Sequence, residues 1–289
     1  MKDYGKIGIL GGDARMSYAA ERLADSAECA VWGIGGTLSS CAVRAADWQS
    51  AVRGADAVVL PLPVTRDGEN LSAPGVRERV PLDGILDVMK TGAILFGGKL
   101  PPLFIACARE RGIRAVDYYE DEAFQIAGAV QTAEGAVAAC IDALPGTVSG
   151  MDCAVIGCGR VGRILANRLR ALGAHVTVAA RNPRDRAWAA ADGCAPVELA
   201  GWLRDPAPVE AVFSTVPVPV LDADALGHFP PSAVFFELAD GIDRHAAEER
   251  GLTVIALPGL PGKVSPKSAG ESIAASVLCI LGEGGGLHG

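Results

Sequence analysis

The sequence predicts an α/β fold built from two doubly wound domains with a cleft between them. Short apolar runs, typical of buried parallel strands, alternate with helical patterns along the whole chain. Two of these runs lead directly into glycine turns, at residues 11–12 and 157–162, so a strand, a turn and a helix follow one another twice. With 289 residues, half of them hydrophobic, the chain can bury two cores. Each half is therefore expected to be a Rossmann-like domain.

The second domain opens on a glycine fingerprint. The apolar run 153–156 enters Gly157-Cys158-Gly159-Arg160-Val161-Gly162, and a helical pattern follows. Gly157 permits the turn, Gly159 lets a pyrophosphate approach the backbone because it has no Cβ, and Gly162 lets the helix pack on the strand. Free N–H groups and the helix dipole favour an anion there. We therefore predict dinucleotide binding at this turn, including Arg160 and Val161; an ordinary strand-to-helix turn is the alternative.

The next strand, 174–180, indicates which dinucleotide is bound. It ends in Arg181 and Asn182, where an NAD site usually carries an acid for the ribose 2′-hydroxyl. The planar charged fork of Arg181 suits a 2′-phosphate instead, so the sequence favours NADP(H). A solvated arginine at a strand end is the alternative. Farther along, the strand 211–215 ends at three more candidate cofactor contacts, near the nicotinamide ribose: Thr215, Val216 and Pro217.

The first domain has a related but different opening. The strand 6–10 leads into Gly11-Gly12-Asp13-Ala14-Arg15, which lacks the spacing of a full fingerprint. The following helix could hold a substrate carboxylate at its N-terminus, helped by Arg15; a plain turn with Arg15 in solvent is the alternative. Further strands are expected at 29–32, 56–60, 93–96 and 113–116, a surface loop at 66–81, and an exposed acidic helix start at 118–122.

A helix over residues 131–145, stopped by Pro145-Gly146, is expected to link the domains. Thr132 and Glu134 at its polar start are candidates for catalytic contacts with substrate or nicotinamide, and helix capping is the alternative. Residues 258–267 contain too much proline and glycine for regular structure, so we expect a loop lining the cleft. Its Lys263 and Lys267 are candidate substrate-binding cations, or simply surface lysines.

These elements predict the domain boundaries. The first domain covers residues 1–130 and binds substrate, and a C-terminal helix at 268–282 packs back on it. The second covers residues 131–267 and binds NADP.

Composition excludes several classes of protein. A net charge of -8 without a basic run argues against nucleic-acid binding. No apolar run reaches the ~18–20 residues of a membrane span, and no signal peptide is visible, which indicates a cytoplasmic protein. The 8 cysteines form no C-x-x-C pair and lie mostly in apolar segments. They indicate buried thiols in a reducing compartment rather than disulfides or a metal site.

Four motifs together resemble the family formed by the A subunits of dipicolinate synthase. They are ILGGDAR at 9–15, TAEGA at 132–136, VIGCGRVG at 155–162 and LPGLPGKVSPKSAG at 257–270. They occur in the family's order and extend over nearly the whole chain, and the last is the most specific. Two departures are mild: Gln131 stands where a proline is expected, and Cys158 where a bulkier residue is common.

The resemblance implies an oxidoreductase in the mother-cell cytoplasm of a sporulating bacterium. The substrate would be dihydrodipicolinate, or its hydrated precursor, and the product pyridine-2,6-dicarboxylate. It also implies a partner, the B subunit of dipicolinate synthase, which is a flavoprotein that binds FMN; we also expect homo-oligomers. A small dicarboxylate needs cationic partners, which Arg15, Lys263 and Lys267 can supply. Glu134 is the nearest candidate for the general base.

Two other functions stay open. A 2-hydroxyacid dehydrogenase using NADP would share the two-domain layout but needs a histidine base paired with an acid. The chain has 4 histidines, and none falls in the loop after the sixth strand of the second domain, where that base is expected. They are His175, His228, His245 and His288. The other possibility is a non-catalytic NADP-binding subunit whose partner carries out the chemistry.

Overall fold

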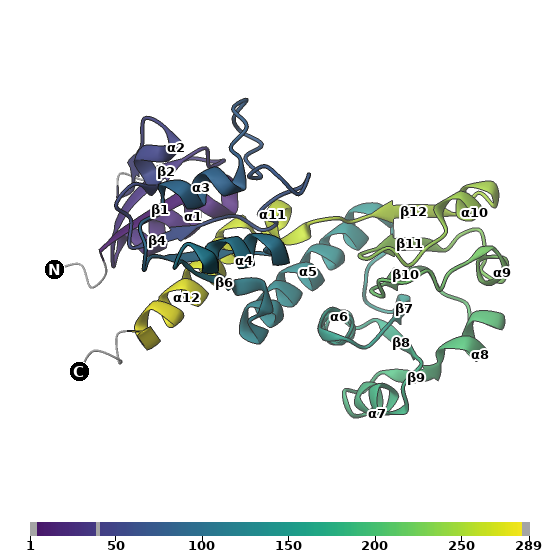
Figure 1. Ribbon diagram of the computed structural model, residues 1–289. Helices are drawn as coiled ribbons and strands as arrows, with labels where there is room; N and C mark the ends of the chain where they lie inside the picture. The colour runs from purple at the N-terminus through teal and green to yellow at the C-terminus, as the bar shows by residue number, and fades with distance from the viewer. Residues whose placement is uncertain (1–4, 39–40, 285–289) are drawn as a thin grey trace. The chain divides into compact units, whose positions relative to one another are not determined.

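The computed structural model describes residues 5–38 and 41–284 and divides into two compact units. Unit 1 comprises Met1–Gly128 and Ser265–Gly289, and unit 2 comprises Ala129–Val264. Within the described residues, each unit has one parallel sheet of 6 strands with helices on both faces (Figure 1). The predicted α/β fold with two doubly wound, Rossmann-like domains is confirmed.

The two sheets have the same strand order. Unit 1 runs β3-β2-β1-β4-β5-β6, and unit 2 runs β9-β8-β7-β10-β11-β12. In this order the chain switches direction beside its first strand, between β1 and β4 and again between β7 and β10. Ligands of such folds bind beyond the carboxyl ends of the strands at this switch point. The candidate sites of both units are therefore expected at these edges.

The elements of unit 1 follow the predicted alternation. Its strands are β1 (Lys6–Leu10), β2 (Glu28–Trp32), β3 (Val43–Arg44), β4 (Ala57–Val59), β5 (Ile94–Gly97) and β6 (Arg114–Asp117). Its helices are α1 (Ala14–Ala24), α2 (Trp48–Val52), α3 (Leu82–Val88), α4 (Pro102–Glu110), a short 3-10 helix (Tyr118–Glu120) and α12 (Pro266–Gly284). Helix α5 (Glu122–Ala143) starts in unit 1 and ends in unit 2.

The elements of unit 2 are equally regular. Its strands are β7 (Asp152–Ile156), β8 (His175–Ala180), β9 (Ala195–Glu198), β10 (Ala211–Ser214), β11 (Val234–Glu237) and β12 (Thr253–Ala256). Its helices are α6 (Arg160–Ala171), α7 (Pro183–Ala191), α8 (Leu199–Arg204), α9 (Ala223–Leu226), α10 (Arg244–Glu249) and α11 (Leu260–Val264). In the described part of the chain, no helix combines the length and apolar character needed to cross a membrane.

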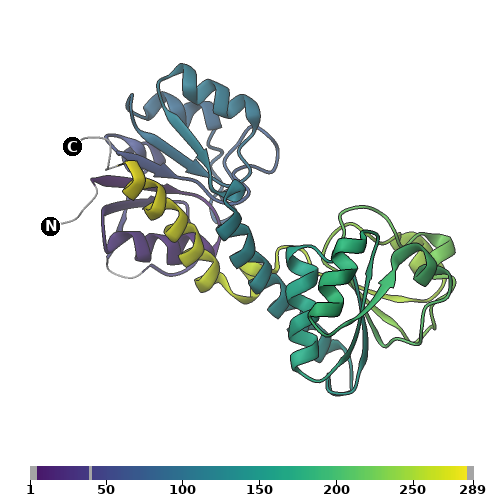
Figure 2. The same ribbon diagram turned by 90° about the horizontal axis from the view of Figure 1, so that it is seen from below.

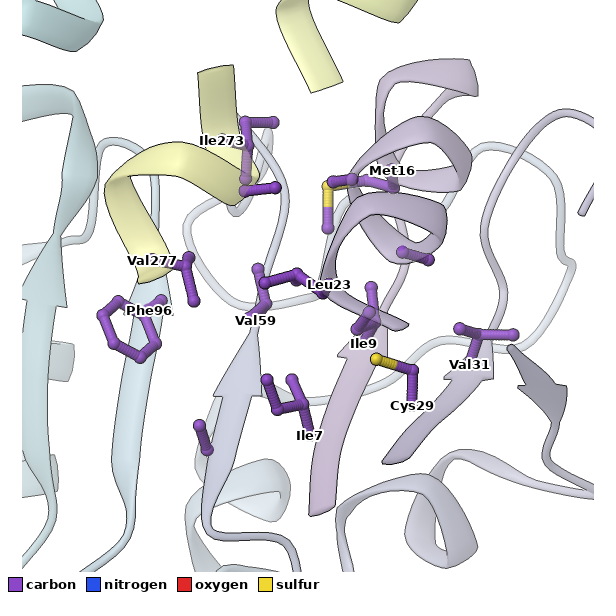
Figure 3. Packing of buried hydrophobic residues seen from close by; sticks show 14 of the residues in the cluster. Ile7, Ile9, Met16, Leu23, Cys29, Val31, Val59, Phe96, Ile273 and Val277 are labelled. Carbon is purple, nitrogen blue, oxygen red and sulfur yellow. The ribbon is translucent and has the colours of Figure 1, made fainter. Parts of the chain in front are cut away.

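The first sheet is buried on both faces because its strands are apolar at successive positions. Ile7 and Ile9 of β1 point toward α1 and α12, where they join Leu23 and Val277 in one core cluster (Figure 3). Leu10 belongs to a second cluster on the other face, with residues of α2, α3 and α4. This two-sided burial explains the near-continuous apolar runs in the sequence.

The C-terminal helix α12 packs back on unit 1, as predicted; it lies against α1, and Figure 2 shows the two helices side by side. Gly270 makes this close approach possible. A Cβ at this position would lie 2.2 Å from the carbonyl oxygen of Arg15 and 2.7 Å from Cβ of Tyr18. The last helix is thus held against the first by a position that has no room for a side chain.

Three expectations about local structure are wrong. The segment 258–267 contains α11 and the start of α12 instead of an irregular loop. Pro261 and Pro266 lie in the first turns of these helices, where a missing N–H breaks no helical hydrogen bond. The linker helix begins at Glu122, nine residues before the expected start. Tyr118, expected in an exposed helix start, is fully buried, and its hydroxyl donates to the carbonyl of Leu60 at 3.0 Å.

The contact at Gly270 generates a stability prediction. Gly270→Ala should lower the free energy of unfolding by about 1–3 kcal/mol, because the added methyl overpacks the α1–α12 contact. Gly84→Ala in α3 is the matched control, since a Cβ there meets Trp48 at an ordinary 3.5 Å. This control should be neutral or stabilising. Urea unfolding of both variants measures the difference, and equal effects would contradict the packing argument.

Candidate functional site

The glycine turn after β7 gives each glycine a different physical role. Gly157 has a φ of 98°, which L side chains rarely adopt. A Cβ on Gly162 would lie 2.3 Å from the carbonyl oxygen of Gly157, so the helix could not approach the turn with any side chain there. Gly159 differs from both, because its φ of -76° is ordinary and no atom lies within 4 Å of the place for its Cβ. Space is left open at the helix start.

The N-terminus of α6 carries backbone N–H groups that no side chain caps. Gly159 is its N-cap, and no side chain caps the helix. The first N–H groups of an α-helix have no carbonyl acceptor one turn earlier in the same helix. A helix start of this kind, with the positive end of its dipole, is suited to an anion. Burial raises the pKa of the neighbouring Cys158 thiol, which keeps it protonated, as expected of a small filler in the turn.

The end of β10 closes the other side of the turn. Both the N–H and the hydroxyl of Thr215 donate to the carbonyl of Ile156, at 3.1 Å and 2.9 Å. Its hydroxyl oxygen lies 2.7 Å from the place where a Cβ of Gly157 would be. Thr215 therefore shapes the turn, while Val216 is half-buried and Pro217 is exposed beyond it. The predicted contacts at both strand ends lie at the same switch point.

Positive charge gathers at the end of β8. Arg181 and Arg184 are exposed. Arg186 is half-buried, and its Nη1 donates to the carbonyls of Ala180 at 2.9 Å and Arg181 at 2.7 Å. The side-chain oxygen of Asn182 accepts from the N–H of Arg184 at 2.9 Å and so caps α7. The predicted Arg181 is thus available to a ligand, whereas the oxygen of Asn182 has a structural role.

A neighbouring arginine is already paired. Arg163, in the first turn of α6, donates to Asp192 from Nε at 2.6 Å and from Nη2 at 3.1 Å. Its guanidinium also lies 4.1 Å from the ring centroid of Trp188 on α7. The hydrogen bond from Arg163 lowers the pKa of the Asp192 carboxyl. This arrangement joins the two helices flanking the β8 turn, and the sequence analysis did not predict it.

The candidate catalytic residues on α5 are not brought together. Glu134 is exposed, and its Oε1 lies 3.7 Å from Nε of Arg168, also exposed. Thr132 is half-buried. Residues two apart point to different sides of a helix, so their side chains do not face one another. Because α5 begins at Glu122, the alternative interpretation as helix caps is wrong.

In unit 1, the guanidinium of Arg15 is hydrogen-bonded to neighbouring residues of the sheet edge. Its Nε and Nη2 donate to Asp13 at 2.8 Å each, and Nη2 also donates to the carbonyl of Leu62 at 2.6 Å. Burial alone would raise the pKa of the Asp13 carboxyl, but the hydrogen bonds and charge of Arg15, with the charge of Arg66, bring it below its usual value. Asp13 also caps α1. The alternative of a solvated Arg15 is wrong, because the guanidinium is held in a neutral pair.

The two candidate lysines near the C-terminus lie in different settings. Lys263 is exposed in the last turn of α11. Lys267 lies in the first turn of α12, with its Nζ 4.0 Å from Glu271. It lines a hollow of about 370 Å³ shared with α1, which contains both acidic and basic side chains. The charge of Lys267 is therefore partly balanced.

The amino edge of the second sheet carries a different feature. A hollow of about 310 Å³ there is lined by residues of β7, β8 and β9, among them His175 and Asp152. Nδ1 of His175 lies 3.2 Å from Asp152, and both side chains are exposed. This edge is opposite the glycine turn. Within residues 5–38 and 41–284, no cluster of side chains suited to a metal ion occurs.

Comparison with known proteins adds evidence to this geometry. Residues 6–119 match the model of the N-terminal domain of the dipicolinate synthase A subunit, and residues 127–243 match the NAD binding domain of D-isomer specific 2-hydroxyacid dehydrogenases. The A subunit of dipicolinate synthase from Bacillus subtilis (strain 168) is 27% identical over 289 residues, 96% of each chain.

Solved structures agree with these matches. The A subunit of dipicolinate synthase from Bacillus halodurans superposes with a TM-score of 0.83 at 27% identity, covering 96% of this chain and 98% of that chain. The A chain from Bacillus subtilis has a TM-score of 0.83 at 26% identity, covering 98% and 97%. D-lactate dehydrogenase from Escherichia coli shares the fold, with a TM-score of 0.57 at 14% identity and coverage of 96% and 97%.

The glycine turn generates a prediction about stability. Gly162→Ala should lower the free energy of unfolding by about 1–3 kcal/mol, because the methyl collides with the carbonyl of Gly157. Gly159→Asp should cost less than about 0.5 kcal/mol, because the site is open and aspartate is a favoured N-cap residue. Thermal and urea unfolding compare the two, and a strongly destabilised Gly159→Asp would show that this position is closed.

Proposed function

Because this chain matches the dipicolinate synthase A subunit over 96% of its length, we propose that it oxidises dihydrodipicolinate, or its hydrated precursor with loss of one water, to pyridine-2,6-dicarboxylate with NADP. Its second unit is a nicotinamide-nucleotide-binding domain of the dehydrogenase type, and its fold and family matches make it an oxidoreductase. The observation that carries the proposal is the open, uncapped start of α6 within a chain that matches this protein from end to end.

The residues of unit 2 fit such a cofactor. The pyrophosphate would be held by the N–H groups at Gly159, Arg160 and Val161, where the absence of a Cβ leaves room. Thr215, Val216 and Pro217 would border the nicotinamide ribose. When bound, the cofactor accepts a hydride from the substrate. The protein's part is to orient the substrate, exclude water and accept the proton released with that hydride.

The 2′-phosphate would lie against Arg181, with Asn182 shaping the turn beneath it. Glu198, at the end of the neighbouring strand β9, pairs with Ala180 in the sheet. Its two carboxylate oxygens accept from the N–H groups of Ala200 at 3.1 Å and Gly201 at 2.7 Å. These hydrogen bonds lower the pKa of Glu198 and commit its carboxylate to the start of α8. The strand β8 itself ends in Arg181 and Asn182 instead of the acid that binds a 2′-hydroxyl in an NAD site, which supports NADP over NAD.

We assign the remaining roles on the same basis. Unit 1 is proposed to bind the dicarboxylate and unit 2 the cofactor. Arg15, Lys263 and Lys267 are the proposed cationic partners of the substrate, and Glu134, with Thr132, the proposed proton-handling group on α5. The homologue is named as one subunit of a synthase, so we also propose a partner, the FMN-binding flavoprotein B subunit, together with homo-oligomers in the mother-cell cytoplasm of a sporulating bacterium.

A 2-hydroxyacid dehydrogenase is the second candidate, because residues 127–243 match that family's NAD binding domain. The described histidines do not support it. His175 lies at the amino end of β8, and His245 pairs with Glu249 at 3.6 Å on a solvent-exposed face of α10. His228 is exposed ahead of β11, and His288 lies outside the described residues. A general base should be sheltered near the carboxyl ends of the strands.

Cofactor choice is tested by fluorescence titration of the purified chain. NADPH should bind at least about tenfold more tightly than NADH, because a 2′-phosphate gains a charge-assisted contact with Arg181. Arg181→Ala should remove most of this difference without weakening NADH binding. Arg109→Ala, an exposed arginine on α4, is the control and should change neither affinity. Equal affinities in the parent chain would refute the assignment.

Catalysis is tested by formation of pyridine-2,6-dicarboxylate from dihydrodipicolinate, with and without the flavoprotein partner. Gly159→Asp should fold normally but lose NADPH binding, because it places a carboxylate where the pyrophosphate lies. Product formation by Gly159→Asp should therefore fall at least about a hundredfold. Undiminished product formation by Gly159→Asp in the presence of the partner would favour a non-catalytic role for this chain.

A further inference from the structure

We propose that Lys99 is a substrate-binding residue that supplies the positive charge for one carboxylate of a small dicarboxylic acid in unit 1. The inference rests on the proposed function for the identity of the acid, but its site is read from the first sheet alone. Lys99 follows β5 directly after Gly97 and Gly98, at the carboxyl edge of the sheet. Its side chain is exposed. Among residues 5–38 and 41–284, Lys99 is the one non-glycine residue with a positive φ, which is 57°.

The surrounding structure enforces this unusual backbone conformation. Asp117, at the end of β6, accepts hydrogen bonds from the N–H groups of Lys99 at 3.1 Å, Leu100 at 2.8 Å and Tyr119 at 2.9 Å. One residue before Lys99, the N–H of Gly98 donates to the carbonyl of Pro61 at 3.2 Å. A left-handed conformation disfavours any residue with a Cβ and persists where neighbouring contacts determine it. Glycine would suit this position better, so the lysine side chain needs another explanation.

The ammonium group of Lys99 lies over an aromatic ring. Its Nζ lies 4.9 Å from the ring centroid of Tyr119. In the described part of the chain, no carboxylate forms an ion pair with it. A cation over an aromatic face keeps its full charge while its range of positions narrows. The Lys99 ammonium group is therefore positioned to bind an anion from solution.

Arg15 complements Lys99 and cannot replace it. Leu62 links Arg15 to the turn that carries Lys99: its carbonyl accepts from Arg15, and its Cβ lies 2.7 Å from the place where a Cβ of Gly98, the residue before Lys99, would be. The Nε and Nη2 groups of Arg15 already donate to Asp13 and Leu62, and Asp13 balances the charge of the guanidinium. The two N–H groups of Nη1 remain to orient a carboxylate. The Asp117 carboxylate accepts from three backbone N–H groups at this edge, so Lys99 is the cation whose side chain remains to pair with a bound carboxylate.

The test measures binding of pyridine-2,6-dicarboxylate to the full chain by isothermal titration calorimetry, with and without NADP. The informative variant is Lys99→Gly, because glycine relieves the left-handed backbone and removes the charge. Its melting temperature should equal or exceed that of the parent chain, while the diacid affinity should fall at least about tenfold. Lys99→Arg should retain most of the affinity. Lys90→Gln is the control: this lysine pairs with Asp56 at the opposite edge of the sheet, and its loss should leave diacid binding unchanged.

The outcomes separate this inference from the proposed function. Parent-like diacid binding by Lys99→Gly overturns the role of Lys99, and so does a parent chain that binds NADPH but no diacid. Loss of diacid binding in Lys99→Gly, with NADPH binding intact, supports it. If the chain binds the diacid through Lys99 but neither binds NADPH nor forms product, the carboxylate site stands and the proposed function fails.

Discussion

The contact between α6 and the end of β7 is the constraint on which the proposed cofactor site depends. The helix starts so close to the turn that a Cβ on Gly162 would lie 2.3 Å from the carbonyl of Gly157. This proximity aims the first N–H groups of α6 across the switch point of the sheet. No side chain caps the helix at this start. The close packing required at Gly162 thus determines where the proposed anion site lies.

The same strand order serves two different purposes in the two units. In unit 2 the N-cap of the first helix is a glycine with open space around it. In unit 1 the corresponding N-cap is Asp13, whose carboxylate already occupies the helix start and binds Arg15. One opening can receive a phosphate, whereas the other carries its own anion. The proposed division of roles between the units rests on this difference in the turn.

The cations at the carboxyl edges of the two sheets fall into two groups, those paired within the protein and those exposed to solvent. Several cations are structural: Arg15 is paired with Asp13, Arg163 with Asp192, and Arg186 with backbone carbonyls. Their donors orient turns and helices, and much of their charge is balanced locally. Arg181 and Lys99 differ, because each is exposed at a strand end without a paired acid in the described part of the chain. Recognition of a phosphate or a carboxylate depends on such cations.

The sequence by itself determined the fold class, the order of most elements and the glycine turn, because alternation, apolar runs and glycine spacing are local properties of the chain. It also indicated Arg181 by the absence of an acid at a strand end. Only the tertiary structure decided which candidate side chains are free. Asp13 neutralises Arg15, Asn182 caps a helix, and Thr132 and Glu134 lie on different sides of α5. Lys99 could not be singled out from its neighbours in sequence, because its left-handed backbone is imposed by Asp117, eighteen residues away.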